Sequence, residues 1–159
     1  MSEATVDCYN AGMNAYAQGR YEEAKAWFEK EAGNPMCQYA LGVLHYNGQG
    51  TERDFTEAAR WYEKAAEAGV VPAQRAIGFA YANALGVPED FAKAVRFLRL
   101  ASDAGDIAAR ITLGELCAMD VGVGTREEAA DLIHSAIEAG AGEEAHDVWS
   151  RYELWKVGV

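Results

Sequence analysis

Histidine and cysteine often ligate metals or act as nucleophiles in proteins, and this sequence contains three of each. The histidines are His45, His134 and His146. They lie far apart, and none has a second histidine four residues away, the spacing that places two ligands on one helical face. The cysteines are Cys8, Cys37 and Cys117. Their odd number and their spacing fit neither a paired zinc motif nor a disulfide framework, so we predict no metal site and three free thiols.

Two further patterns could indicate catalysis or phosphate binding. Adjacent acids occur at Glu22–Glu23, Glu127–Glu128 and Glu143–Glu144. Neighbours on a helix point about 100° apart, and each pair lies near a predicted helix start, where negative charge is favourable. The run from Gly122 to Arg126 is similar to a phosphate-binding loop, but it lacks the lysine and the preceding strand. We therefore predict no catalytic residues and no cofactor.

Composition and charge narrow the range of partners. Of the 159 residues, 50% are hydrophobic and 25% are charged, which is typical of one globular domain. The formal net charge is −11, whereas nucleic acids and anionic membranes bind clustered cations. We expect neither of them as a partner, and we expect a protein or peptide, with a basic one favoured by charge. The acidic N-terminal segment, the absence of a long apolar run and the cysteine usage predict a cytoplasmic location.

An internal repeat organises the chain, because an aliphatic residue followed by glycine recurs every 36 residues. These pairs are Leu41–Gly42, Ile77–Gly78 and Leu113–Gly114. Each unit continues with an alanine, a bulky apolar residue three positions later and a closing glycine. These triplets are Ala58, Trp61 and Gly69; Ala94, Phe97 and Gly105; and Ala129, Leu132 and Gly140. Small residues allow neighbouring helices to approach closely, and glycine suits a helix C-terminus. Each unit is therefore predicted to be helix, loop, helix and turn, with Trp61 buried in the best-matched unit.

On these residues the chain resembles the Sel1-like repeat proteins, a branch of the tetratricopeptide-like helical repeats. The first full unit carries Leu41, Gly42, Gly48, Gly50, Asp54, Ala58, Trp61, Ala65, Ala66 and Gly69. The second carries Gly78, Tyr81, Gly86, Val87, Asp90, Ala94, Phe97, Ala101 and Gly105. The third unit is degenerate, and the N-terminal stretch has the shorter tetratricopeptide spacing. The resemblance implies adaptor and scaffold roles and fixes no partner.

The predicted fold is all-α, a right-handed α-solenoid of antiparallel helix pairs with about four repeats and a C-terminal capping helix. Residues 1–159 form one domain, with units at about 4–34, 35–70, 71–105 and 106–141 and a capping helix at 142–157. Helices should break near residues 19, 33, 49, 69, 86, 105, 122 and 141, and no sheet is expected. The segments Asp54–Glu57 and Thr125–Glu128 have the form of capping boxes that start second helices.

The first helices of stacked pairs line a concave face. By analogy with tetratricopeptide geometry, groove-facing positions lie three residues before each repeat glycine and one and four residues after it. The predicted groove residues are Tyr9, Met13, Tyr16, Tyr39, Val43, Tyr46, Arg75 and Phe79. Ala82, Ile111, Glu115 and Ala118 occupy the remaining equivalent positions. Exposed apolar patches mark interfaces, and tyrosine and methionine are favoured contact residues. The alternative is that a tight superhelix buries these side chains between repeats.

These features predict a non-enzymatic protein–protein interaction module that binds a peptide or protein in its concave groove. A dedicated inhibitor or immunity-type binder of a basic protein is an alternative, because residues 105–140 carry seven acids and two bases. A ligand-binding regulator or enzyme would place polar groups around His45, which stands at the repeat position of Tyr81. A scaffold or homo-oligomer could assemble through Trp149 and Trp155.

Overall fold

The structure is a computed structural model that describes residues 6–158. In this range the regular elements are helices, and no strand is present. They are α1 (Cys8–Ala17), α2 (Tyr21–Lys30), α3 (Pro35–Asn47), α4 (Phe55–Glu67), α5 (Val71–Asn83), α6 (Phe91–Asp103), α7 (Ile107–Ala118), α8 (Arg126–Glu138), α9 (Glu143–Arg151) and the 3₁₀ helix η1 (Leu154–Lys156). Every predicted helix break falls between two of these helices, and the all-α prediction is confirmed. The predicted start of the first unit, at residue 4, lies outside the described residues.

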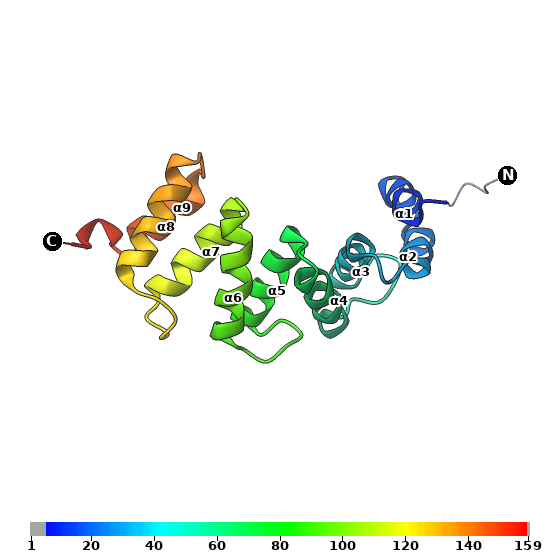
Figure 1. The fold of residues 1–159 in the computed structure, drawn as a ribbon, viewed down its shortest axis with the longest axis horizontal. Helices are drawn as coiled ribbons and strands as arrows, with labels where there is room; N and C mark the ends of the chain where they lie inside the picture. Colours follow the sequence, from blue (N-terminus) through cyan, green and yellow to red (C-terminus); the bar gives the residue numbers. More distant parts are fainter. Residues whose placement is uncertain (1–5, 159) are drawn as a thin grey trace.

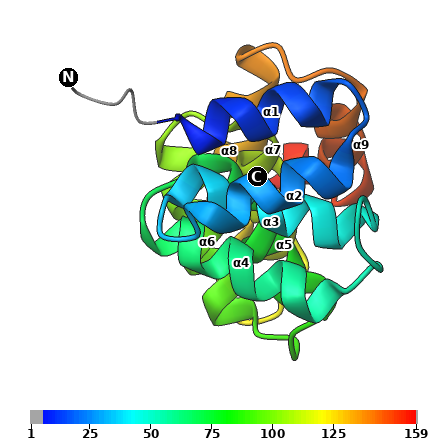
Figure 2. The same cartoon turned by 90° about the vertical axis from the view of Figure 1, so that its right-hand side faces the viewer.

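Consecutive helices form the pairs α1–α2, α3–α4, α5–α6 and α7–α8, and each pair packs on the next one. Figure 1 shows the pairs following one another along the long axis, from α1 at the right to α9 at the left, with the two termini at opposite ends. Figure 2, seen from the α1 end, shows the helices turning around this axis. Because contacts join mainly neighbouring pairs, the fold is an α-solenoid.

Side-chain caps start the second helices at the predicted residues. The Asp54 carboxylate accepts a hydrogen bond from the Glu57 backbone N–H at 3.0 Å, and the Thr125 hydroxyl accepts one from the Glu128 backbone N–H at 3.1 Å. The reverse half of the first capping box is replaced, because the Asp54 backbone N–H donates to the carbonyl of His45 at 2.9 Å. This bond ties the start of α4 to the last turn of α3.

Each repeat glycine is covered by a large side chain from the second helix of its own pair. The four contacts are Gly12–Phe28, Gly42–Tyr62, Gly78–Leu98 and Gly114–Ile133. A Cβ atom added to Gly78 or Gly114 would lie 2.7 Å from a side-chain carbon of Leu98 or Ile133. The absence of a Cβ atom at these positions therefore lets the two helices of a pair pack closely, and the covering side chains are buried.

The bulky residues of the repeat pattern each precede by one position the side chain that covers the repeat glycine; they are Trp61, Phe97 and Leu132, before Tyr62, Leu98 and Ile133. Phe97 is fully buried, whereas Trp61 and Leu132 are only partly buried. Adjacent helical positions differ by about 100°. Because Tyr62 faces Gly42 within its own pair, Trp61 faces a different direction.

Trp61 packs instead against a core cluster to which α1, α2 and α3 contribute and which contains Phe28 and Leu41. Its outer face is covered by two cations of α4, with the Arg60 guanidinium 4.6 Å and the Lys64 ammonium 5.0 Å from the ring centre. Trp61 therefore packs on a cluster shared by the first two pairs, and the prediction that it is buried is wrong.

The capping helix is shorter than the sequence predicted. Helix α9 ends at Arg151 rather than at residue 157, because Glu153 adopts a left-handed conformation with φ of 50° and the chain continues as η1. Val148 of α9 and Leu154 of η1 are buried, whereas the side chain of Trp155 is 50% exposed. The end of the solenoid is thus covered by two short elements.

Candidate protein-binding groove

A first hollow lies at the N-terminal end of the solenoid, between α1 and α3. We call it the N-terminal hollow, and its volume is about 200 Å³. Its lining consists of Tyr9, Met13, Tyr16, Phe28, Met36, Tyr39, Ala40 and Val43. Five of the eight predicted groove residues therefore meet here, on the first helices of two consecutive units, as the repeat spacing predicts. The lining contains no charged side chain, so the hollow is suited to apolar or aromatic groups.

A second hollow, which we call the central hollow, brings together the other three predicted groove residues, Tyr46, Arg75 and Phe79. Its volume is about 320 Å³, and its walls come from α3, α4, α5, α7 and α9 and from the loop after α5. Its further lining residues are Phe55, Ala58, Ala59, Tyr62, Ala76, Ala80, Leu85, Ala108, Thr112 and Glu144. The repeat spacing did not predict Phe55, Leu85 or Glu144, because they lie outside the first helices of the four repeats.

A third hollow, the C-terminal hollow, has a volume of about 320 Å³ and is lined by Phe79, Ala82, Asn83, Thr112, Glu115, Leu116, Met119, Glu144 and Tyr152. It shares Phe79, Thr112 and Glu144 with the central hollow. The two hollows therefore adjoin along Phe79. We refer to the three hollows together as the groove.

The aromatic rings between the hollows pack against one another at tilted angles. The ring centre of Tyr62 lies 5.8 Å from that of Tyr39, in the N-terminal hollow, and 6.5 Å from that of Tyr46, in the central hollow. The Tyr16 hydroxyl donates to the Gln49 side-chain oxygen at 3.2 Å. Burial raises the pKa of the Tyr39 hydroxyl, although the nearby Arg75 opposes this effect. These contacts hold the tyrosines in place before any partner binds.

The sequence left open whether the predicted groove residues are exposed in a groove or buried between repeats, and their burial in the structure lies between these two alternatives. Met13 and Phe79 are exposed, by 39% and 44% respectively. The other six are partly buried; they are Tyr9, Tyr16, Tyr39, Val43, Tyr46 and Arg75. In the last unit, by contrast, Ile111 and Ala118 are buried. The groove residues thus pack against their neighbours and still present part of their surface.

Helix α9 explains why the groove-facing positions of the last unit are more buried than those of the other units. It packs on α7 and α8 and brings Glu144 to the edge of the groove. The Arg151 guanidinium of α9 forms an ion pair with the Glu115 carboxylate of α7 at 2.9 Å. Glu115 occupies a groove-facing position by its spacing, so this ion pair closes the groove at its C-terminal end.

Most charges near the groove are neutralised within the chain. The Arg75 guanidinium lies 2.9 Å from the Asp106 carboxylate, which also caps the start of α7 by accepting from the Ala109 N–H at 2.8 Å. At the other edge, Arg53 donates to the carbonyl of Tyr46 at 3.1 Å and lies 4.5 Å from the ring centre of Phe55. The charge of Arg75, which was predicted at the edge of the groove, is therefore balanced by Asp106, although part of its side chain is still exposed.

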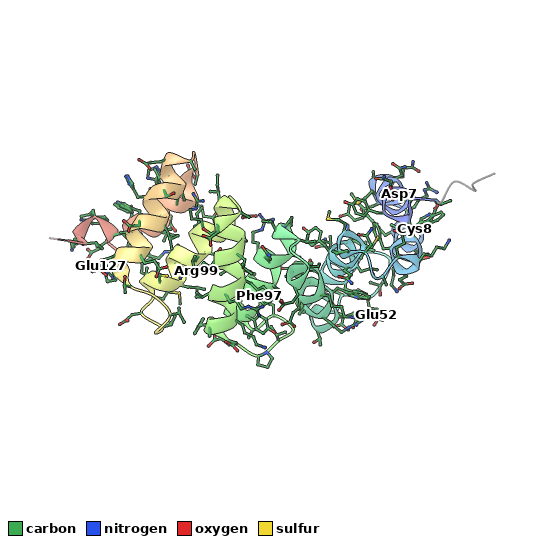
Figure 3. All side chains as sticks on the ribbon, in the orientation of Figure 1. Asp7, Cys8, Glu52, Phe97, Arg99 and Glu127 are labelled. Carbon is green, nitrogen blue, oxygen red and sulfur yellow. The ribbon has the colours of Figure 1, made fainter. Side chains whose placement is uncertain are left out.

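The acids of residues 105–140 do not form one patch. Three of them are ion-paired: Asp106 with Arg75, Glu115 with Arg151, and Glu128 with Arg99 at 2.7 Å. Figure 3 shows Arg99 left of the centre of the solenoid and Glu127 nearer its left-hand end. Three exposed acids of this stretch, in the described part of the chain, have no such pair; they are Asp120, Glu127 and Asp131.

The residues first considered for chemistry lie apart from the groove. Across residues 6–158, no group of three His, Cys, Asp or Glu side chains is placed to hold a metal ion. Cys37 and Cys117 are buried, Cys8 is partly buried, and all three are unpaired. His45 does not line the three hollows. Its burial lowers its pKa against the opposing effect of Glu57. Over the same residues, no helix has the length and hydropathy needed to cross a bilayer.

Solved structures with the same fold are found among helical repeat proteins. A Sel1 repeat protein from Oxalobacter formigenes superposes with a TM-score of 0.79 at 28% identity, over 94% of this chain and 61% of that one. A protective antigen of uropathogenic Escherichia coli, c5321, which displays an SLR fold, gives a TM-score of 0.83 at 25% identity, over 96% of this chain and 33% of that one. These neighbours and the repeated pairs define the class as an α-solenoid with an SLR-type fold.

Sequence comparison identifies the type of repeat in two of the helix pairs. The Sel1 repeat model matches residues 35–70 and 71–106, which are the second and third helix pairs. The chain therefore contains Sel1 repeats in an SLR-type helical fold, and the resemblance seen in the sequence is confirmed. A chitin synthase regulator, SKT5 of Malassezia restricta, is 35% identical over 68 residues, which are 42% of this chain and 5% of that protein. The chain thus spans less than two thirds of the length of each of these relatives. Sel1 repeats generally mediate protein–protein interactions and are typically non-enzymatic scaffolds.

Proposed function

We propose that this chain is a non-enzymatic interaction module that binds a peptide or protein segment in the groove. The observation that supports the proposal best is the position of Phe79. Its ring is 44% exposed and lines both the central and the C-terminal hollow. A large apolar side chain that a soluble protein keeps exposed inside a concave surface is typical of an interaction site. The free thiols suit action in a reducing compartment such as the cytoplasm.

The tyrosines of the groove support the same function. Tyrosine combines a large apolar ring with a hydroxyl, and it is enriched among the residues that dominate binding energy. Tyr39 and Tyr46 both pack against Tyr62, so their rings are already ordered. A partner that contacts them therefore loses little side-chain entropy on binding.

Alanine substitutions test this proposal with a partner identified by affinity capture and mass spectrometry. Tyr39→Ala, Tyr46→Ala and Phe79→Ala should each weaken binding about 30-fold, since each truncation of such a residue costs about 2 kcal/mol. Leu100→Ala is the matched control, because Leu100 is 46% exposed on α6 and lines none of the three hollows. Calorimetry measures the affinity, and circular dichroism checks that the helical content is unchanged. Capture of a small molecule without any protein partner would contradict the proposal.

A second candidate is a dedicated binder of a basic protein through the outer surface of α8. It is favoured by the exposed acids Glu127 and Asp131, which have no ion pair within the described residues, and by the net charge of −11. Charge reversal at these two positions should then abolish binding, and groove substitutions should have no effect. If binding is instead through the groove, reversal changes mainly the association rate and its salt dependence.

A further inference from the structure

We infer that the groove around Phe79 takes a partner segment that carries a bulky apolar side chain and, beside it, a lysine or arginine whose cation is received by Glu144. The inference rests on the proposed function and adds to it the chemistry of the partner. It also gives the orientation, with the cation at the α9 end of the groove.

The central hollow accounts for the apolar part. Aromatic and aliphatic side chains form most of its lining, including Phe55, Ala76, Ala80 and Leu85. Its volume of about 320 Å³ accommodates a bulky side chain such as leucine, phenylalanine or tryptophan. Phe79 stands at the boundary of this hollow and supplies an exposed ring for contact.

Glu144 accounts for the cation. Among the described residues, no ion pair or side-chain hydrogen bond engages its carboxylate, although it lines both the central and the C-terminal hollow. Glu115, the other acid that lines the C-terminal hollow, is occupied because it pairs with Arg151, and the nearby Asp106 pairs with Arg75. Glu144 is therefore the carboxylate of the groove that remains available to a partner.

Phe79 and Glu144 together favour a long cationic side chain over a simple ion. Lysine and arginine lay their aliphatic stems along apolar surface while the charged head reaches a polar partner. A cation near an aromatic ring is also attracted by the ring itself. A side chain that crosses Phe79 toward Glu144 makes both contacts at once.

The opposite edge of the central hollow has the opposite charge. Arg53 lies over Phe55, 4.5 Å from its ring centre, at the junction of α3 and α4. A second cation at that edge is disfavoured by repulsion, whereas the α9 edge attracts it. The charge difference between Arg53 and Glu144 therefore sets the direction in which a bound segment lies.

A random-peptide display library tests the inference without knowledge of the natural partner. Selection on the full chain should enrich peptides in which a bulky apolar residue is accompanied by lysine or arginine. Selection on Glu144→Lys should lose that basic preference, and peptides selected on the natural chain should bind this variant about fivefold more weakly, the equivalent of about 1 kcal/mol. Glu143→Lys is the matched control, because it makes the same charge change in the same turn of α9 and Glu143 lines none of the three hollows.

The possible results separate this inference from the proposed function. Peptides that lose binding with Phe79→Ala but show no basic preference would overturn the inference and leave the groove proposal standing. Equal losses with Glu143→Lys and Glu144→Lys would mean that the overall negative charge attracts the peptides, and would also overturn it. Enriched peptides that are insensitive to Phe79→Ala would contradict the groove itself.

Discussion

The Cα atom of Gly42 and the ring of Tyr62 are so close that a Cβ atom on Gly42 would lie 2.5 Å from Cδ1 of Tyr62. The same relationship recurs in every pair, with Phe28, Leu98 and Ile133 as the covering side chains. Tyr62 is buried, with its ring between the groove tyrosines Tyr39 and Tyr46. One contact thus joins the two helices of a pair and supports the floor of the groove.

Tyr62→Ala should therefore destabilise the protein more than Trp61→Ala. Loss of the buried ring leaves a cavity and should lower the free energy of unfolding by about 3–5 kcal/mol. The Trp61 ring is partly exposed, and the surrounding side chains of Arg60 and Lys64 can relax around the gap, so the loss should be about 1–2 kcal/mol. Urea titration of the two variants checks the order. Equal losses would show that both rings contribute alike to the core.

The loop after α5 packs backbone against backbone on the preceding pair. A Cβ atom at Gly86 would collide with the carbonyl of Phe55, at the start of α4, whereas one at Gly122 would meet no atom within 4 Å. Both glycines have positive φ, at +73° and +81° respectively. Gly122→Ala should cost about 1 kcal/mol from backbone strain alone.

Gly86→Ala shares that strain and adds the collision, so it should lower the free energy of unfolding by at least about 2 kcal/mol more. Thermal unfolding followed by circular dichroism compares the two variants directly. Equal melting temperatures would show that the loop can move away from α4 without loss.

The sequence predicted the helix breaks and which first-helix residues share a face, because both depend on local signals. Caps such as Asp54 act within one turn, and the 36-residue repeat spacing places Val43 and Phe79 at equivalent positions of α3 and α5. It failed where two adjacent positions are both bulky, since hydrophobicity alone does not say whether Trp61 or Tyr62 faces the repeat glycine.

The sequence also did not predict the contacts between units. Arg75 and Asp106 are 31 residues apart, and their ion pair depends on how two units stack. The contribution of Glu144 depends on the angle at which α9 packs across α7, and α9 lies outside the repeat pattern. Capping elements differ from the repeats that they cover, so the repeat pattern carries no information about them.

The thiols should differ in reactivity. Burial raises the pKa of both Cys37 and Cys117 to about 11, so these thiols remain protonated and inert at neutral pH. Cys8 is partly buried and lies in the first turn of α1. Alkylation of the native protein should modify Cys8 first, and alkylation of the denatured, non-reduced protein should modify all three. Mass spectrometry with Cys8→Ser as control checks the assignment, and a total of one would reveal a disulfide.

Stability should decline in mild acid because of His45. Burial holds its pKa below the usual value of 6.5, so the folded protein keeps the ring neutral while the unfolded chain takes up a proton. The contribution is fully present above pH 6.5 and is lost as the pH falls from there toward the folded pKa. His45→Gln should flatten this part of the stability–pH curve. His146→Gln, at an exposed position on α9, should leave it unchanged, and a curve unaffected by either substitution would argue against the role of His45.

Three methionines of the groove can report on binding by NMR, because Met13 and Met36 line the N-terminal hollow and Met119 lines the C-terminal hollow. The most direct measurement of the central claim is a titration of methyl-labelled methionine protein with the captured partner, followed by NMR. Binding along the groove predicts that the methyl resonances of Met13, Met36 and Met119 shift together and saturate at one equivalent. Saturable binding that leaves all three resonances unchanged would contradict the claim and place the interface elsewhere on the solenoid.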